Sequence, residues 1–304
     1  MSRSRENHVV EPSAEAARER VLAGTRVRQE CGDVAGVSTA VLECGAGPPV
    51  VLLHGQGAFA GLWLPVMVGL DRSYHVIAPD LSGLGASKAP EGPLGPDAVL
   101  GWLAALIGQT CDEPPALVGL SLGGQIAARF AAHHSARLAR LVLVDTPGLV
   151  GRLRPAPGTL LALIRHTARP SQRTTLRRFR HLVVDVDRLR QRLGERWEPF
   201  LAYMVDRART PSVRQANRCL MKEIGLQRIP AADIDRISVP TTLIWGREDR
   251  VASLPTAEKA SSRHGWPLHI IDDAGHLALA EQPQGFLQVL HAALDSSAQG
   301  VETT

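Results

Sequence analysis

One serine of this 304-residue chain lies in a segment whose composition suits nucleophilic catalysis. Ser121 is the centre of Gly-Leu-Ser-Leu-Gly-Gly at 119–124, directly after a short apolar run and before an amphipathic, helix-like pattern. A G-x-S-x-G segment between a strand and a helix predicts a sharp turn that raises the serine hydroxyl above a sheet. The glycines suit such a turn because its backbone approaches itself closely. On its own, the segment is equally compatible with a glycine-rich turn without a catalytic role.

A serine hydroxyl is a weak nucleophile near neutral pH and needs a base beside it. Among the eleven histidines, His276 has the most suitable context, because it follows the last strand-like run and precedes the final helical pattern. A lone loop histidine is usually a surface residue, but this one lies where the chain order serine, acid, histidine requires the base.

The histidine in turn needs a carboxylate that fixes its tautomer and stabilises its protonated form. Asp249 follows the seventh strand-like run and is the preferred acid, although in isolation it would be a polar turn residue. Glu248 is adjacent to it, and Asp145, after the sixth run, is a rival acid.

A substrate oxygen that becomes negatively charged needs hydrogen-bond donors around it. The backbone N–H of Leu122, directly after the serine, is one expected donor. The second is expected from the loop His-Gly-Gln-Gly at 54–57, with the N–H of Gln56 favoured and that of Gly57 as the alternative. A turn-only role for these glycines stays open.

A sheet must position these residues, and short apolar runs predict one. Eight strands are expected at residues 26–31, 37–44, 50–54, 75–79, 116–119, 141–145, 241–245 and 268–272. The first two alternate in polarity and predict an antiparallel edge hairpin, whereas the later runs are almost wholly apolar, as in strands covered by helices on both faces. Helical patterns separate the runs, so we predict an α/β fold with an eight-stranded, mostly parallel sheet flanked by helices.

The stretch between the sixth and seventh strands is too long for one crossover helix. It contains five helical patterns, with Ser171 and Asp185 as expected N-caps. We interpret residues 148–234 as a helical cap (lid) inserted at the carboxyl ends of the strands, where open α/β sheets bind ligands. Residues 25–147 and 235–296 then form the core, and residues 1–12 and 297–304 are expected to be disordered.

Composition excludes several other classes of protein. Apolar residues make up 44% and charged residues 21% of the chain, as in ordinary globular domains, and no apolar run is long enough to span a membrane. The first residues lack the apolar stretch of a secretory signal, so we expect a cytoplasmic protein. The four cysteines lack metal-ligand spacing. We expect no metal, no organic cofactor, and no membrane or nucleic-acid partner.

Positive charge is concentrated in the helical insertion. Residues 151–230 contain 17 arginines and one lysine against six acidic residues, a balance of +12 in a chain whose net charge is +4, so the rest carries −8. This balance favours an anionic substrate, although the arginines are equally compatible with solvent-exposed helix faces.

Six segments together resemble the α/β-hydrolase superfamily, in the branch with a helical cap after the sixth strand. They are HGQG (54–57), DLSGLGAS (80–87), GLSLGG (119–124), LVLVDTPG (141–148), WGREDRV (245–251) and AGHLALAEQP (274–283), in family order. The resemblance implies a catalytic triad of Ser121, Asp249 and His276. The serine at position 121 excludes the epoxide hydrolases and haloalkane dehalogenases, whose nucleophile is an aspartate.

The implied activity is hydrolysis of an ester or related acyl bond of a small molecule, as in carboxylesterases. Thioesterases and C–C bond (meta-cleavage-like) hydrolases are alternatives, but the latter usually carry HGxGPG where this chain has HGQGAFAG. The superfamily also includes lyases, cofactor-free oxygenases and ligand-binding proteins, because fold alone does not decide function. The sequence leaves the substrate and the oligomeric state open.

Overall fold

The computed structural model describes residues 13–151 and 156–295. Eight strands form one sheet in the order β1-β2-β4-β3-β5-β6-β7-β8. The hairpin β1–β2 lies at one edge, β2 runs antiparallel to β4, and all other neighbours are parallel. The predicted eight-stranded, mostly parallel sheet is therefore confirmed. The strands are β1 (Arg28–Val34), β2 (Val37–Cys44), β3 (Pro49–Leu53), β4 (His75–Pro79), β5 (Ala116–Leu120), β6 (Arg140–Val144), β7 (Thr241–Gly246) and β8 (Leu268–Ile271).

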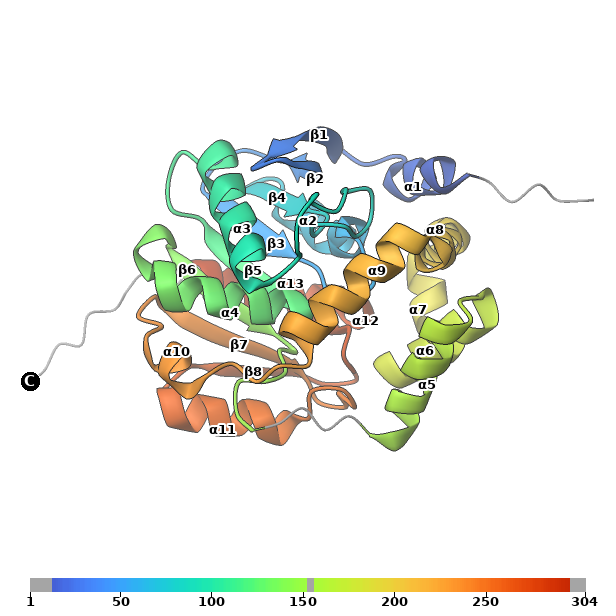
Figure 1. Cartoon of the computed structure of the whole chain (residues 1–304). Helices are drawn as coiled ribbons and strands as arrows, with labels where there is room; N and C mark the ends of the chain where they lie inside the picture. Colours follow the sequence, from blue (N-terminus) through green and yellow to red (C-terminus); the bar gives the residue numbers. More distant parts are fainter. Residues whose placement is uncertain (1–12, 152–155, 296–304) are drawn as a thin grey trace, which may run out of the picture.

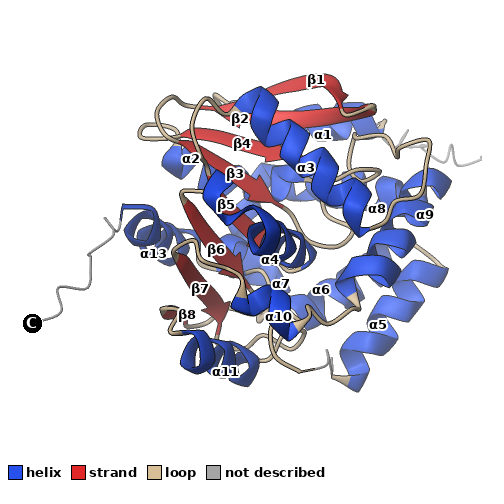
Figure 2. Ribbon diagram, turned by 60° about the vertical axis from the view of Figure 1, so that its left-hand side comes forward, coloured by secondary structure: helices blue, strands red, loops and turns tan. Residues whose placement is uncertain are grey.

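The parallel strands are almost wholly apolar because both faces of the sheet are covered. On β3, Val50 and Leu52 enter one core, while Val51 and Leu53 enter a second core on the opposite face. Figure 2 shows helices on both sides of the sheet. One face packs on α3 (Pro96–Thr110), α4 (Leu122–His134) and α11 (Leu254–His264), and the other on α2 (Leu64–Leu70) and α13 (Pro283–Asp295).

Within the described residues, six α-helices lie between β6 and β7, and the first five, which we call the inserted helices, lie together beyond the carboxyl ends of the strands (Figure 1). Ser171 and Asp185 cap two of them, because their side chains accept backbone N–H groups of the first helical turn. A single π-helical turn, Met221–Gly225, leads back toward the core. The inserted helices are α5 (Pro157–Ala168), α6 (Gln172–Leu182), α7 (Val186–Leu193), α8 (Trp197–Arg209) and α9 (Pro211–Leu220).

Three helices were not predicted from the sequence. Two of them, α10 (Ala231–Asp235) and α12 (Ala278–Glu281), are too short to show a helical period, and α1 (Ala14–Leu22) is charged along most of its length. The disorder expected for 1–12 and 297–304 falls outside the described residues. Within the described ranges, none of the helices has the length and apolar character that crossing a membrane requires.

A buried ion pair joins α1 to the loop that follows β4. Arg18 Nη1 lies 2.7 Å from Asp80 Oδ2, and the two side chains are 4% and 0% exposed. Asp80 also accepts the N–H groups of Ala60 at 2.6 Å and Ala86 at 2.7 Å. Arg18 donates to the hydroxyl of Tyr203 on α8 at 3.2 Å. The loops after β3 and β4, α1 and the insertion therefore meet at one pair of buried charges.

We predict that Arg18→Met lowers the free energy of unfolding by about 3–5 kcal/mol, because it leaves the Asp80 carboxylate buried without its cation. The control is Arg188→Met, which removes an exposed pair with Asp273 at 3.8 Å and should cost less than about 1 kcal/mol. Chemical denaturation of both variants measures the difference. Equal losses of unfolding free energy in the two variants would show that the buried pair stabilises the fold no more than the exposed pair does.

Candidate active site

Ser121 occupies the sharp turn between β5 and α4. Its backbone has φ 54° and ψ −114°, a strained conformation for a residue with a side chain. The Ser121 N–H donates to the carbonyl oxygen of Val144 at 2.9 Å, which holds the turn against β6. The turn therefore fixes the serine at the carboxyl edge of the sheet.

Neighbouring glycines allow the backbone to close around this turn. A Cβ atom on Gly119 would lie 2.5 Å from the carbonyl oxygen of Gly123. One on Gly123 would lie 2.3 Å from the carbonyl oxygen of Leu53. Both distances are far below van der Waals contact, so the close approach expected from the sequence is confirmed.

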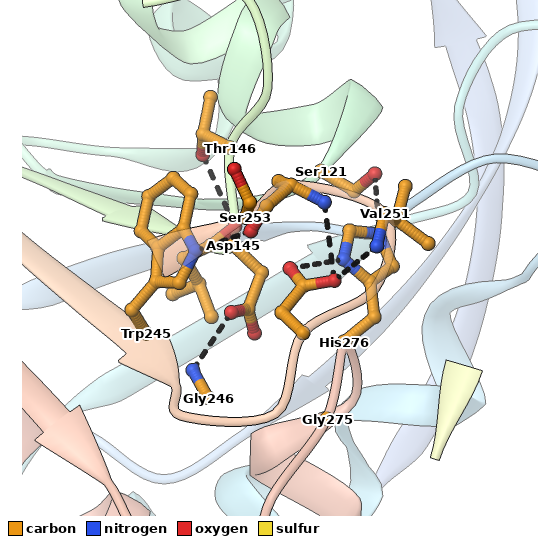
Figure 3. Close-up of polar contacts among 12 residues, drawn as sticks. Ser121, Asp145, Thr146, Trp245, Gly246, Val251, Ser253, Gly275 and His276 are labelled. Carbon is orange, nitrogen blue, oxygen red and sulfur yellow. Dashed lines mark hydrogen bonds and ion pairs between the residues drawn. The ribbon is translucent and has the colours of Figure 1, made fainter. Parts of the chain in front are cut away.

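The structure brings Ser121, His276 and Asp249 together in a line of hydrogen bonds. Figure 3 shows Ser121 and His276 within this group of polar contacts. His276 Nε2 lies 2.9 Å from Ser121 Oγ, and His276 Nδ1 lies 2.8 Å from Asp249 Oδ2. Since a carboxylate only accepts, Nδ1 carries the proton and Nε2 accepts the serine hydroxyl. Asp249 Oδ1 accepts the N–H groups of Val251 at 2.7 Å and Ala252 at 3.1 Å, which orient the carboxylate.

Glu281 holds the loop that carries His276. Its two carboxylate oxygens accept the N–H of Gly275 at 2.7 Å and that of Val184 at 2.6 Å. The His276 N–H itself donates to the carbonyl oxygen of Leu182 at 2.7 Å. Burial raises the pKa of Glu281, while its N–H donors favour the charged form. The histidine loop is thus tied to the segment between α6 and α7.

The two other acids considered from the sequence have different partners. Glu248 accepts the N–H of Ala274 at 3.1 Å. Asp145 is fully buried after β6 and accepts the N–H of Gly246 at 2.8 Å. Burial, followed by the charge of nearby Asp249, raises the pKa of Asp145 well above its usual range. Burial thus favours the neutral form of Asp145, and the acid hydrogen-bonded to His276 is Asp249.

The loop after β3 places Gln56 near Ser121. Gln56 and Leu122 line the same pocket as Ser121, whereas Gly57 lines a second pocket beside it. Within the described residues, the N–H groups of Gln56 and Leu122 donate to no backbone acceptor. Both donors are therefore free to bind an oxygen atom at the serine.

His54 stabilises this loop through two hydrogen bonds to the backbone. The N–H of Leu81 donates to His54 Nε2 at 3.0 Å, so Nδ1 carries the proton and donates to the carbonyl oxygen of Gly55 at 2.9 Å. Burial lowers the pKa of His54, which keeps the ring neutral. The histidine of the HGQG segment thus has a positioning role that the sequence did not reveal.

A largely apolar pocket of about 110 Å³ opens above Ser121. Arg178 on α6 also lines it and donates from Nη2 to the carbonyl oxygen of Gln56 at 2.9 Å. Sequence reasoning missed this residue, because nothing distinguishes it from the other arginines of the insertion. In the part of the chain that the structure describes, no His, Cys, Asp and Glu cluster is placed to hold a metal ion. The apolar lining residues from the insertion include Leu160, Leu163, Phe179, Phe200, Met204 and Met221.

Comparison with known proteins agrees with this architecture. A family model described as the alpha/beta hydrolase family matches residues 50–289. A 2-hydroxy-6-oxo-2,4-heptadienoate hydrolase of Pseudomonas putida is 30% identical over 88% of this chain and 97% of its own length. A pimeloyl-[acyl-carrier protein] methyl ester esterase of Aeromonas hydrophila is 28% identical over 84% of this chain and 98% of its own. The crystal structure of a membrane phospholipase A is similar with a TM-score of 0.75, 26% identity, and coverage of 93% and 90%.

We predict that Asp145→Asn stabilises the protein increasingly as pH rises. The raised pKa means that the folded protein keeps the proton of Asp145 to a higher pH than the unfolded chain, which ionises it near pH 4. The contribution of Asp145 to the free energy of unfolding is therefore fully present at acidic pH and is lost as the pH rises. An asparagine does not ionise, so the variant does not lose stability in this way. The melting temperature of the variant relative to the natural protein should be higher at pH 8 than at pH 5.

The matched control for this prediction is Asp112→Asn, at an exposed site. Its melting-temperature difference from the natural protein should not depend on pH in this range. If the melting-temperature difference for Asp145→Asn does not depend on pH, the raised pKa of the buried acid is contradicted.

Proposed function

Because this chain belongs to the alpha/beta hydrolase family, we propose that it is a serine hydrolase that cleaves an ester or related acyl bond of a small molecule. The observation that carries the proposal is the continuous hydrogen-bonded path from Ser121 Oγ through His276 to Asp249. Such a path activates a serine hydroxyl without the help of a metal ion or an organic cofactor.

In the proposed reaction, Ser121 Oγ attacks the carbonyl carbon while its proton passes to His276 Nε2. Asp249 stabilises the resulting imidazolium through Nδ1–H, and the N–H groups of Leu122 and Gln56 bind the oxyanion. When the tetrahedral intermediate collapses, the leaving group departs with the proton of His276 and the acyl group remains on Ser121. Water then attacks the acyl carbon, with His276 as base, and releases the acid and the free serine.

The proposal gives the inserted helices the role of a cap. Residues 148–234 would cover the site, and residues 25–147 and 235–296 would form the catalytic core. The supporting observation is that side chains of α5, α6 and α8 line the pocket above Ser121. Access to the serine then depends on these helices, which would also select the substrate. We place the enzyme in the cytoplasm.

A second candidate is cleavage of a carbon–carbon bond by the same three residues. It is favoured by the 30% identity with the 2-hydroxy-6-oxo-2,4-heptadienoate hydrolase. Thioester cleavage is a third, chemically close candidate. Values of kcat/KM for an ester, a thioester and a vinylogous diketone distinguish the three, because the natural bond type should be preferred.

We predict that Ser121→Ala lowers kcat for a 4-nitrophenyl ester by at least about 10³-fold, because the nucleophile is absent. The fold should be retained, as judged by an unchanged circular dichroism spectrum. The control is Ser253→Ala, at an exposed serine outside the hydrogen-bonded line, which should keep its activity. A fluorophosphonate probe should label the natural protein and Ser253→Ala but not Ser121→Ala. Full activity of Ser121→Ala would refute the proposed nucleophile.

We also predict that the two buried aspartates differ in their importance for catalysis. Asp249→Asn should lower kcat by about 10⁴-fold, because the amide favours the wrong histidine tautomer. Asp145→Asn should lower kcat by less than about tenfold, since His276 bonds to Asp249 instead and an amide oxygen can still accept the N–H of Gly246. Steady-state kinetics of both variants give the two losses of kcat. A larger loss in Asp145→Asn than in Asp249→Asn would identify Asp145 as the acid of the triad.

A further inference from the structure

A second cavity, of about 40 Å³, lies beside the pocket above Ser121. The two cavities share lining residues, among them Gln56, Leu163 and Arg178. Side chains of α5, α6, α8 and α9 enclose the smaller one, which we call the arginine chamber. A water molecule occupies about 30 Å³ in the liquid, so the chamber has room for a group of a few atoms.

Three arginines line the arginine chamber, and no acidic side chain does. Arg207 is paired with Asp206 at 2.6 Å. Arg178 and Arg214 instead donate to backbone carbonyl oxygens, those of Gln56 at 2.9 Å and Thr167 at 3.1 Å. Across residues 13–151 and 156–295, neither of these two guanidinium groups has a carboxylate partner.

The chamber also contains buried polar atoms without hydrogen-bond partners. They are Arg214 Nε and Asn217 Oδ1. A buried polar atom without a partner costs about 1–3 kcal/mol, so such atoms indicate a site for a bound group. Rotation of the Asn217 amide would turn its NH₂ group into the chamber as a further donor.

Electrostatics favours an anion in this place. Burial lowers the pKa of Arg178 to about 10, so the group still carries its charge at neutral pH. Burial, and then the charge of Arg178, lowers the pKa of His166 to about 3, so this lining residue is neutral. Arg178 and Arg214 are partly buried, and two neighbouring cations without a carboxylate partner favour the binding of an anion between them.

We propose that the arginine chamber binds a carboxylate of the substrate while the carbonyl to be cleaved lies at Ser121. The substrate would then be an ester that carries a carboxylate at a fixed distance from the ester bond. The inference rests on the proposed hydrolase function and adds a substrate class to it. Arg178 and Arg214 supply paired donors of the geometry that suits carboxylates. Among the described arginines of the insertion, these two line the chamber without a carboxylate partner.

The test compares monomethyl and dimethyl esters of linear dicarboxylic acids of four to eight carbons. The natural protein should prefer the charged monoester, with a kcat/KM ratio of at least about ten at one chain length. Arg214→Gln should reduce this ratio at least about tenfold at that length. The control Arg218→Gln makes the same substitution at an exposed site of the same helix and should keep the ratio. A ratio unchanged by Arg214→Gln, or a preference for the diester at every length, overturns the proposal.

A binding measurement separates this proposal from the proposed hydrolysis. Monomethyl ester titrated into Ser121→Ala should bind saturably, and at least about tenfold more weakly in Ser121→Ala with Arg214→Gln. Binding that is equal in the two proteins overturns the chamber even if the esterase assignment holds. Full hydrolysis of the diester by Ser121→Ala refutes Ser121 as the nucleophile, whereas the binding comparison tests the chamber alone. Circular dichroism checks folding, and Arg178→Gln, at the other arginine assigned to the carboxylate, replaces Arg214→Gln in both tests if the latter does not fold.

Discussion

The closure of the backbone around Ser121 is the constraint on which the rest of the site depends. The serine has a positive φ, and the chain on either side approaches to distances that leave no space for a Cβ atom at Gly119 or Gly123. Parallel strands end at one edge of the sheet, so the loops after β7 and β8 bring Asp249 and His276 to the same place. The strain is local, and the hydrogen bond of Ser121 to Val144 on β6 helps to hold it.

Buried charged and polar groups hold the loops around this turn. Asp80 accepts two backbone N–H groups and forms an ion pair with Arg18. Glu281 accepts N–H groups from both the histidine loop and the insertion. Asp249 and Asp145 follow adjacent strands, but their surroundings differ. Asp249 accepts two N–H groups and bonds to the imidazole, whereas Asp145, among the described residues, accepts one N–H group and has no ion-pair partner. Burial, and then the charge of Asp249, raises the pKa of Asp145.

The core and the insertion contribute different properties. The family model and relatives with quite different named substrates match most of the chain, the insertion included. Side chains of α5, α6 and α8 form part of the pocket wall. Under the proposed function, selectivity would depend on how these helices pack, in agreement with the general rule that function resides in sites built upon a common fold.

The sequence by itself determined the eight strands, their apolar character and the order of Ser121, Asp249 and His276, because these are local patterns of polarity and glycine placement. It missed α10 and α12, which are shorter than a helical period can reveal. Only the tertiary structure decided which acid contacts His276 and which arginines meet beside Gln56. Residues 56, 178 and 214 come from a loop and two separate helices. Their proximity results from packing between distant segments, which no local pattern in the chain encodes.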